Sequence, residues 1–441
     1  MNGKQSEERQ GRSREAVLRQ YRNHVFPQVK SIHAEPVVVT EGKGCRVRDM
    51  DGASYLDFFG GILTISVGHC NERVTDAIVA QVQRLTHVSS LYPTLPMGEL
   101  AERLARITPG ALEKCFFTAS GSEADEMAVM MAQSHTGNSE IIALRHGYSG
   151  RTLLAQSLTG NSVWRGHAHL APGVRHAPAP YCYRCPFHLT YPKCGVACAR
   201  DVRELIETTT SGRVAGMLAE PVMGVGGFIT PPPEYFAIVA EIVREYGGVL
   251  IADEVQTGFG RTGKRWGIEH YGVEPDLMTM AKGIANGLPL GALVTTAPIA
   301  DSFEKSTLST FGGNPVSCAA ANAVLDVLEE EQLLERAAVM GERLREGLVR
   351  IRHRFPAIVG DIRGIGLMQA IEFVMDETAG DRTPNAELTS GFIEGARRNG
   401  LLLGRGGLYA NVVRIAPPLT VSADEIDEAL AAVENALVPL I

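Results

Sequence analysis

One stretch, residues 248–291, constrains the fold of this chain more than any other. It begins with the apolar run Val249 to Ala252, which ends in two acids, Asp253 and Glu254. A short apolar run that is bounded by glycines predicts a fully buried strand of a parallel sheet. Lys282 follows a second apolar run further along the stretch. Charged groups at the carboxyl ends of such strands lie where open α/β sheets bind their ligands.

Lys282 and Asp253 carry complementary chemistry. A lysine directly after an apolar run is partly desolvated, which lowers its pKa and frees the amine to attack a carbonyl carbon. A buried acid can hold a proton on a pyridine nitrogen. Pyridoxal phosphate (PLP) needs both groups, so the pair predicts a PLP site.

Two segments of this stretch, IADEVQTGFGRTGKRWG and PDLMTMAKGIANGLPLGA, resemble the signature of the class III aminotransferases. Further motifs of that family recur in order from about Asp49 to Pro418. The resemblance implies fold type I, in which a large, doubly wound, mainly parallel α/β domain is joined by a smaller α+β domain built from both chain ends. It also implies PLP as the cofactor and a homodimer or a dimer of dimers.

The resemblance assigns Lys282 as the Schiff-base lysine and proton carrier, and Asp253 as the partner of the pyridine nitrogen. Ser120, Gly121 and Ser122 match the family's phosphate cup, in S-G-S-E-A. They precede an apolar helical pattern, and the free N–H groups and dipole at a helix N-terminus bind anions. We expect Ser122 to cap this helix, because Asp125 lies three residues on.

Four further residues complete the expected cofactor site. Tyr148 and Val255 match the residues that lie on the two faces of the ring, and Gln256 matches the partner of its phenolic oxygen. Thr310 matches the threonine that reaches the phosphate of the neighbouring subunit. A tyrosine in a Gly-rich loop can also be a simple turn anchor, which is the alternative for Tyr148.

Three residues are candidates for substrate binding. Arg414 matches the arginine that binds the α-carboxylate, and Glu220 matches the acid that pairs with it while an ω-amino donor is bound. Arg151 lies where the 4-aminobutyrate branch has a second carboxylate-binding arginine. The alternatives are a solvated arginine at a domain edge, a Glu-Pro turn and an arginine that only braces its loop.

These residues predict an aminotransferase that moves an amino group from an ω-amino acid or amine, such as 4-aminobutyrate, to a 2-oxo acid such as pyruvate or 2-oxoglutarate, by a ping-pong mechanism. A PLP-dependent racemase, an aminomutase and a dialkylglycine decarboxylase are alternatives. The apolar pair Ile62 and Leu63 argues against decarboxylation. In the decarboxylase branch of the family, a glutamine near this position assists the loss of CO₂.

A Pro-rich insert carries Cys182, Cys185, Cys194 and Cys198, with the spacing C-x2-C-x8-C-x3-C. Four thiols so close in sequence could bind zinc or an iron–sulfur cluster, form two disulfides or stay reduced. A metal-binding redox sensor on a retired enzyme scaffold is the remote alternative that only this cluster supports.

The chain divides into four expected parts: a flexible tail over 1–15, an N-terminal segment of the small domain over 16–70, the PLP-binding domain over 71–325 and the C-terminal part of the small domain over 326–441. The net charge of −8 argues against nucleic acid and anionic membranes as partners. No uncharged apolar stretch is long enough to cross a bilayer, and the charged N-terminus is not typical of a secretory signal. We therefore expect a cytoplasmic enzyme.

Several elements follow from periodicity. Val214 to Ala219 predicts a strand, and Pro231 to Pro233 start a helix that leads to the strand before Asp253. Such a strand–helix–strand unit is the crossover of a doubly wound sheet. Residues 321–355 predict one continuous amphipathic helix, and Ser422 is expected to cap the last helix.

Overall fold

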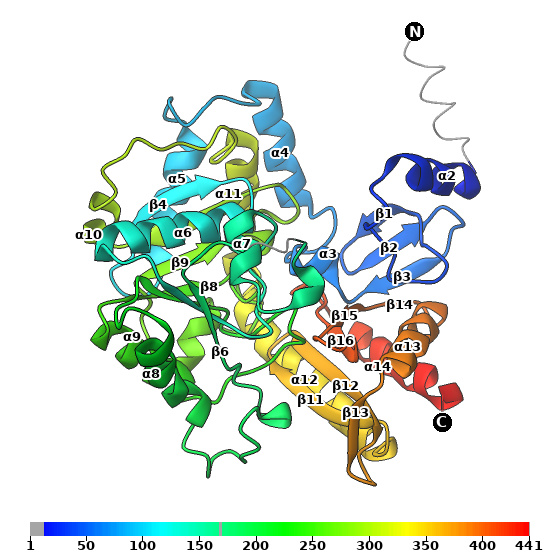
Figure 1. Cartoon of the computed structure of the whole chain (residues 1–441). Helices are drawn as coiled ribbons and strands as arrows, with labels where there is room; N and C mark the ends of the chain where they lie inside the picture. Colours follow the sequence, from blue (N-terminus) through cyan, green and yellow to red (C-terminus); the bar gives the residue numbers. More distant parts are fainter. Residues whose placement is uncertain (1–12, 167–169, 441) are drawn as a thin grey trace.

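The computed structural model describes residues 13–166 and 170–440. A seven-stranded sheet with the order β4-β10-β9-β8-β7-β5-β6 lies at its centre (Figure 1). β10 is antiparallel to β4 and β9, whereas the strands from β9 to β6 are parallel to one another. The strands are β4 (Lys114–Thr118), β5 (Ile141–Leu144), β6 (Val174–Ala177), β7 (Gly216–Ala219), β8 (Val249–Asp253), β9 (Leu277–Met280) and β10 (Gly291–Thr295).

Helices cover both faces of this sheet, so its short strands are apolar throughout. Successive side chains of β5 show this, because Ile142 and Leu144 belong to one core cluster and Ile141 and Ala143 to the other. One face is covered by α6 (Gly121–Thr136), α7 (Leu153–Leu158) and α10 (Ala297–Asp301). The other face carries α4 (Glu72–Arg84), α5 (Leu95–Ile107), α8 (Ala197–Thr209), α9 (Tyr235–Glu245) and α11 (Pro315–Glu330).

A four-stranded sheet joins the two ends of the chain. β1 (Val39–Lys43), β2 (Arg46–Asp49) and β3 (Ser54–Asp57) form an antiparallel meander, and β14 (Leu401–Leu402) adds to β3 in parallel. Two backbone hydrogen bonds, Leu56 N to Gly400 O at 2.8 Å and Phe58 N to Leu402 O at 3.0 Å, hold this junction. It brings the N-terminal and C-terminal segments side by side, as fold type I requires. Helix α2 (Arg14–His24) precedes the meander, and α3 (Gly60–Leu63) follows β3.

A five-stranded C-terminal sheet completes the molecule. β11 (Val359–Ile365), β12 (Met368–Asp376), β16 (Val412–Ile415) and β15 (Gly404–Gly406) follow one another, and β13 (Asp381–Pro384) pairs with β12. The helices packed around it are α12 (Leu333–Arg354), α13 (Ala386–Arg398) and α14 (Ala423–Leu437). Short 3₁₀ turns are η1 (Ser162–Trp164), η2 (Cys182–Arg184), η3 (Gly267–Tyr271), η4 (Lys282–Ala285) and η5 (Val438–Leu440).

One predicted helix is interrupted in the structure, and one predicted helix cap is confirmed. The continuous helix over 321–355 is wrong, because α11 ends at Glu330 and α12 begins at Leu333. Gln332 between them has a φ of 51°, and this left-handed residue redirects the chain. The apolar periodicity continues through the break, so it does not reveal the turn. The predicted cap of α14 is confirmed: Ser422 Oγ accepts from Glu425 N at 3.2 Å.

The predicted tail over 1–15 lies mostly outside the described residues, since the structure begins at residue 13. Its predicted end is placed too far along the chain, because α2 already begins at Arg14 with Ser13 as its N-cap. Within the described residues, no helix is long and apolar enough to cross a membrane.

Candidate active site

A cavity of about 180 Å³ opens at the carboxyl ends of β7, β8 and β9. This is the edge that the sequence predicts, and residues from widely separated segments meet there. The lining residues are Gly121, Ser122, Asp125, Tyr148, Ser149, Gly150, Glu220, Asp253, Val255, Gln256, Ala281 and Lys282.

Asp253 and Glu254 point to opposite sides of β8, because successive side chains of a strand alternate. Asp253 lines the cavity and accepts a hydrogen bond from Val255 N at 3.0 Å. Burial raises the pKa of Asp253 to about 6. Glu254 instead accepts from the amides of Gly267 and Ile268, at 2.9 and 2.7 Å, and braces the loop after β8.

Lys282 begins η4 directly after β9 and is half-buried at the cavity. Its φ of 46° is left-handed, a conformation that costs free energy in a residue other than glycine. Desolvation lowers the pKa of the Lys282 amine, against the opposing effect of Asp253 and Glu220. The Lys282 amine therefore loses its proton at a lower pH than the amine of an exposed lysine does.

The N-terminal segment packs on the lysine turn, as the resemblance implies. Val67 N donates to Asn286 Oδ1 at 3.0 Å, and Asn286 Nδ2 donates to Gly68 O at 2.9 Å. A Cβ on Gly283 would lie 2.5 Å from Ser66 Oγ, so only glycine fits between the two segments. This contact fixes the position of the turn that carries Lys282.

The predicted helix cap at Ser122 is wrong. Ser120 is the N-cap of α6: its Oγ accepts from Glu123 N at 3.3 Å, and Glu123 Oε2 accepts from Ala119 N at 3.2 Å. Gly121 and Ser122 are the first two residues of the helix, and amides at this position have no acceptor within the helix. Ser122 lines the cavity, while the Ser120 hydroxyl is occupied by Glu123.

Tyr148, Val255 and Gln256 line the cavity together. Gln256 is buried, and its Oε1 has no hydrogen-bond partner among the described residues. Glycines make room around these side chains: a Cβ on Gly224 would lie 2.1 Å from Gln256 Nε2, and a Cβ on Gly150 would lie 2.0 Å from Ser122 Oγ. An orphaned amide oxygen, a helix N-terminus, an acid and an amine around one cavity fit PLP.

Arg414 lies beside this group on β16 and is buried. Its guanidinium stacks on Phe59 and Phe228, with centroid distances of 4.8 and 5.8 Å, and donates to Arg405 O. Nη1 of Arg414 is buried and has no hydrogen-bond partner among the described residues. Burial lowers the pKa of Arg414 to about 10.

Glu220 follows β7 and lines the cavity. Both of its carboxylate oxygens accept backbone hydrogen bonds, from Tyr148 N at 3.0 Å and Gly224 N at 2.7 Å. Burial and the nearby Asp253 raise the pKa of Glu220 to about 8. Glu220 and Arg414 do not form an ion pair here, although both belong to the described residues.

Four predicted residues lie outside the cavity lining: Ser120 and Arg414, described above, and Arg151 and Thr310. The side chain of Arg151 is exposed, and its backbone N donates to Ser122 Oγ at 3.1 Å. Its guanidinium lies near enough to Tyr148 to lower the pKa of that phenol, although burial raises this pKa overall. Thr310 is exposed on the loop before α11. Within one chain it does not meet the cavity.

Four lining residues were not among the predicted site residues: Asp125, Ser149, Gly150 and Ala281. Of these four, the charged one is Asp125. It was expected to complete a helix cap, but it is 1% exposed and points from α6 into the cavity wall. Thr279 Oγ1 donates to Asp125 Oδ1 at 2.7 Å. An acid between the small residues Ala124 and Ala128, on a face where α6 packs on the sheet, is the signal that could have marked it.

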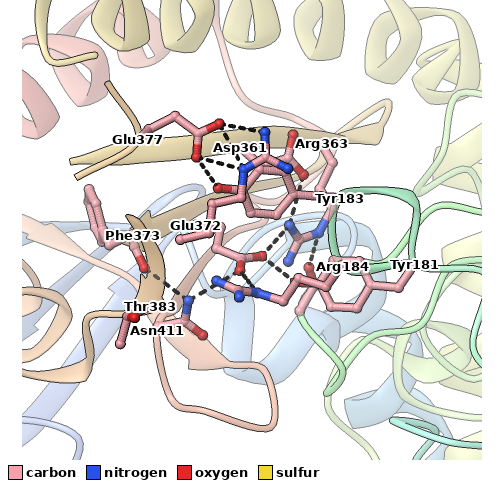
Figure 2. Close-up of polar contacts among 12 residues, drawn as sticks. Tyr181, Tyr183, Arg184, Asp361, Arg363, Glu372, Phe373, Glu377, Thr383 and Asn411 are labelled. Atoms are coloured by element: carbon pink, nitrogen blue, oxygen red, sulfur yellow. Dashed lines mark hydrogen bonds and ion pairs between the residues drawn. The ribbon is translucent and has the colours of Figure 1, made fainter. Parts of the chain in front are cut away.

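A second charged group, which we call the anchor cluster, joins the insert to the C-terminal sheet (Figure 2). Its centre is Glu372 on β12, which is fully buried. Figure 2 shows four side chains that donate to this carboxylate: Tyr181, Arg184, Arg363 at 2.7 Å and Asn411 at 3.2 Å. Burial alone would raise the pKa of Glu372, but these partners lower it.

The four clustered cysteines lie beside the anchor cluster, at η2 and the start of α8, and line a small separate cavity. All eight cysteines of the chain are free thiols in the structure. Among the described residues, no three His, Cys, Asp or Glu side chains are arranged to hold a metal ion. Burial raises the pKa of Cys198 to about 12, with a contribution from the neighbouring thiols. This disfavours the thiolate that metal binding or exchange requires.

Comparison with known proteins agrees with the PLP site that the geometry indicates. The family model described as "Aminotransferase class-III" matches residues 28–437. The chain belongs to the class III aminotransferase family. It is an enzyme of fold type I that uses PLP and takes an amino donor and a 2-oxo acid as substrates.

Three similar proteins illustrate the range of the family. An alanine–glyoxylate aminotransferase 2 homologue of Arabidopsis thaliana, named as mitochondrial, is 39% identical over 97% of this chain and 88% of its own length. A leucine/methionine racemase of Thermococcus litoralis is 36% identical over 96% of this chain and 95% of its own. The crystal structure of an (S)-enantioselective ω-transaminase from Thermomicrobium roseum superposes with a TM-score of 0.89 at 34% identity, over 97% of this chain and 98% of its own.

Proposed function

We propose that the enzyme moves an amino group from an ω-amino acid or amine, such as 4-aminobutyrate, to a 2-oxo acid by a ping-pong mechanism. The observation that carries the proposal is Arg414, whose Nη1 is buried without a partner among the described residues. A buried guanidinium N–H of this kind favours a carboxylate, which it can bind in a bidentate fashion. Contact with the rings of Phe59 and Phe228 restricts the orientation of the Arg414 guanidinium. The carboxylate of a 2-oxo acid fits this position.

PLP supplies an aldehyde that combines with amines and a ring that accepts electrons. In our proposal, the Lys282 amine would hold the cofactor and would move a proton at the substrate carbon. Asp253 holds the proton on the pyridine nitrogen, and Gln256 Nε2 donates to the phenolic oxygen. The amides of Gly121 and Ser122 bind the phosphate with the hydroxyls of Ser120 and Ser122, although Ser120 must first release Glu123.

Tyr148 and Val255 both line the cavity, and we propose that they enclose the ring. Both belong to loops that directly follow strands, β5 and β8, so the sheet fixes their positions. Val255 also contacts the place where Gly121 would carry a Cβ, at 3.1 Å. This close approach supports a narrow slot between the helix and the loop after β8.

Two carboxylates must be bound in turn if an ω-amino donor and a 2-oxo acid share one cavity. We propose that Arg151 binds the distal carboxylate of the donor, and that Arg414 binds the carboxylate of the acceptor. Glu220 would turn toward Arg414 when no α-carboxylate is present. The two backbone donors that hold Glu220 here would then be released.

A panel of donors tests this proposal. Each amine is mixed with the PLP-loaded enzyme, and the change in cofactor absorbance is followed in the half-reaction without acceptor. We expect ω-amino acids and amines to convert the cofactor, and a 2-oxo acid to restore it with formation of one equivalent of amino acid. No conversion by any ω-amino donor would contradict the proposed substrate class.

Racemisation is the second candidate, since a leucine/methionine racemase is among the similar proteins. Chiral chromatography of a single amino acid, incubated without any acceptor, separates the two activities. We expect no interconversion of enantiomers at a rate that matches transamination.

We also propose that the active form is a homodimer or a dimer of dimers. The support is a set of exposed large apolar side chains, at the start of α5 and in the loop before it (Leu91 68%, Tyr92 67% and Leu95 76% exposed) and next to Thr310 (Phe311 62% exposed). Obligate interfaces bury more than ~2,000 Å² and are rich in such side chains. A monomer with full activity in analytical ultracentrifugation would contradict this. A cytoplasmic location stays a prediction, which cell fractionation tests.

A further inference from the structure

Three acids meet at the cavity: Asp125, Glu220 and Asp253 are 1%, 5% and 3% exposed. The charges that face them are Lys282 in the cavity and, for Glu220, Arg414. Neighbouring buried carboxylates cannot all ionise, because each disfavours the charge of the next. One of them must therefore keep its proton, and the hydrogen bonds around each acid decide which.

Glu220 and Asp253 are built to be carboxylates. Glu220 accepts two backbone N–H bonds, and Asp253 accepts one from Val255 and lies against Lys282. Hydrogen bonds to the charged form of an acid favour that form. Burial still raises the pKa of both, to about 8 for Glu220 and about 6 for Asp253, so Asp253 ionises first.

Asp125 has the poorest environment for a charge. A single neutral hydroxyl, Thr279 Oγ1, donates to its Oδ1. Burial and the adjacent Asp253 raise the pKa of Asp125 well above its usual value. The Lys282 charge lowers this pKa, but its effect is smaller than theirs. Asp253 lies close enough that its charge disfavours a second charge on Asp125, while the interaction with Asp125 lowers the pKa of Asp253.

The sheet register makes this arrangement rigid. Thr279 on β9 lies directly beside Asp253 on β8, and Glu254 N donates to Thr279 O at 2.9 Å. Asp125 reaches the pair from α6, which packs on both strands. The two acids and the threonine are therefore held by three separate elements.

We propose that Asp125 is a permanently protonated acid that donates a hydrogen bond to Asp253, and is thus a positioning residue for the group that holds the pyridine nitrogen. This inference rests on the proposed role of Asp253. The donated hydrogen bond keeps Asp253 ionised and fixes which of its oxygens faces the cofactor.

Two variants test whether Asp125 acts as a neutral hydrogen-bond donor or as a charged carboxylate. Asn in Asp125→Asn can donate to Asp253 but cannot ionise, whereas Leu in Asp125→Leu has a similar size and can do neither. We expect Asp125→Asn to bind PLP within about threefold of the unmodified protein. Asp125→Leu should bind it at least tenfold more weakly, the effect of a lost hydrogen bond to a charged group. Glu126→Gln, one residue along α6 and outside the cavity lining, is the control and should bind PLP normally.

Infrared spectroscopy of the cofactor-free protein tests the proton directly. With ¹³C-labelled aspartate at pH 7.5, the unmodified protein should show a protonated carboxyl band that shifts with the label, and Asp125→Asn should lack it. The label excludes Glu220, and the measurement needs no activity, so it can fail independently of the proposed substrates. It also decides the matter if Asp125→Leu does not fold. Absence of the band, or PLP binding by Asp125→Asn as weak as that by Asp125→Leu, would overturn the proposal.

Stability gives a third readout. The unfolded Asp125 ionises near its ordinary pKa, while the folded one stays protonated to higher pH, so the folded state binds the extra proton. Its contribution to the free energy of unfolding is therefore lost as pH rises from about 4 toward the folded pKa. The stability of Asp125→Asn relative to the unmodified protein should rise with pH over this window. A pH-independent difference would overturn the proposal.

Discussion

Two buried charged clusters in this molecule have opposite balances. In the cavity, three acids, Asp125, Glu220 and Asp253, have few donors, and burial raises the pKa of each. In the anchor cluster, the single acid Glu372 has four donors, and its pKa is lowered despite burial. A shortage of partners leaves groups free to bind a ligand or to move a proton, whereas an excess of donors holds segments of the chain together.

The position of the anchor cluster explains what it holds. Arg363 Nε donates to Gly227 O at 2.8 Å, in the loop after Glu220. Asn411 donates to Glu372 from the segment that leads into β16, the strand of Arg414. One saturated carboxylate thus braces the supports of two proposed substrate-binding residues. The loop after Glu220 and the segment before β16 are thus held by hydrogen bonds of the anchor cluster.

The largest expected effect comes from removing the amine of the cavity. Lys282→Ala should lower turnover at least ~1,000-fold, because proton transfer and carbonyl attack both lose their group. The folded structure should persist, since the change relieves a desolvated charge. Steady-state kinetics and the loss of the absorbance of covalently held cofactor measure it. Lys264→Ala, at an exposed lysine, is the control.

Breaking the anchor cluster should lower the free energy of unfolding more than it lowers turnover. Glu372→Ala leaves Arg184 and Arg363 without their shared carboxylate, and removing one partner of a buried pair costs roughly 3–5 kcal/mol of unfolding free energy. Glu377→Ala is the comparison, since it removes a neighbouring acid that accepts from the partly buried Tyr183 at 2.6 Å (Figure 2). Its other partner, Arg382, is exposed. The change should cost about 1–2 kcal/mol, the sum of one hydrogen bond and a surface ion pair. Denaturant unfolding compares the two, and equal losses would contradict the special role of Glu372.

The pH dependence of the same variant sharpens the contrast with the cavity. The folded pKa of Glu372 is lower than its unfolded pKa, so its stabilisation is present at neutral pH and lost as pH falls through the folded value. The difference between the unmodified protein and Glu372→Ala should therefore shrink in acid. The cavity acids act in the opposite direction, because their pKa values are raised.

At the edge of the cavity, Arg151→Lys should reduce kcat/KM for donors with a distal carboxylate by about ten- to a hundredfold, since lysine cannot form the bidentate pair. A 2-oxo acid acceptor, bound by Arg414 in our proposal, should be affected less. If plain amines are the best donors and the change has no effect, Arg151 only braces its loop.

The smallest effect is expected from the cysteines beside the anchor cluster. Replacing Cys182, Cys185, Cys194 and Cys198 with Ser should leave turnover unchanged and lower the melting temperature slightly, because none of the four lines the active-site cavity. Elemental analysis of the purified protein tests for bound metal. Loss of turnover in a folded, PLP-loaded variant would show that the insert acts on the chemistry.

Much of the site could be predicted from local sequence. The apolar runs before Asp253 and Lys282 are buried strands, as predicted. Hydrophobic runs of this length specify burial on both faces, and parallel strands bring their carboxyl ends to one edge. These runs place Asp253 and Lys282 at one edge of the sheet, and the resemblance to the class III aminotransferases supplied the other predicted residues of the cavity.

The sequence by itself determined the parallel core, the cofactor class and the lysine–aspartate pair, because these depend on short patterns. Only the tertiary structure decided between two helix caps with the same spacing, Ser120 with Glu123 and Ser122 with Asp125. Asp125 is buried in the cavity wall against Thr279, on a strand far from α6 in the sequence, and Glu123 completes the cap. The partners of Glu372 likewise come from Tyr181 and Arg184, far away in the chain. Local spacing carries no information about such contacts, because packing alone brings distant segments together.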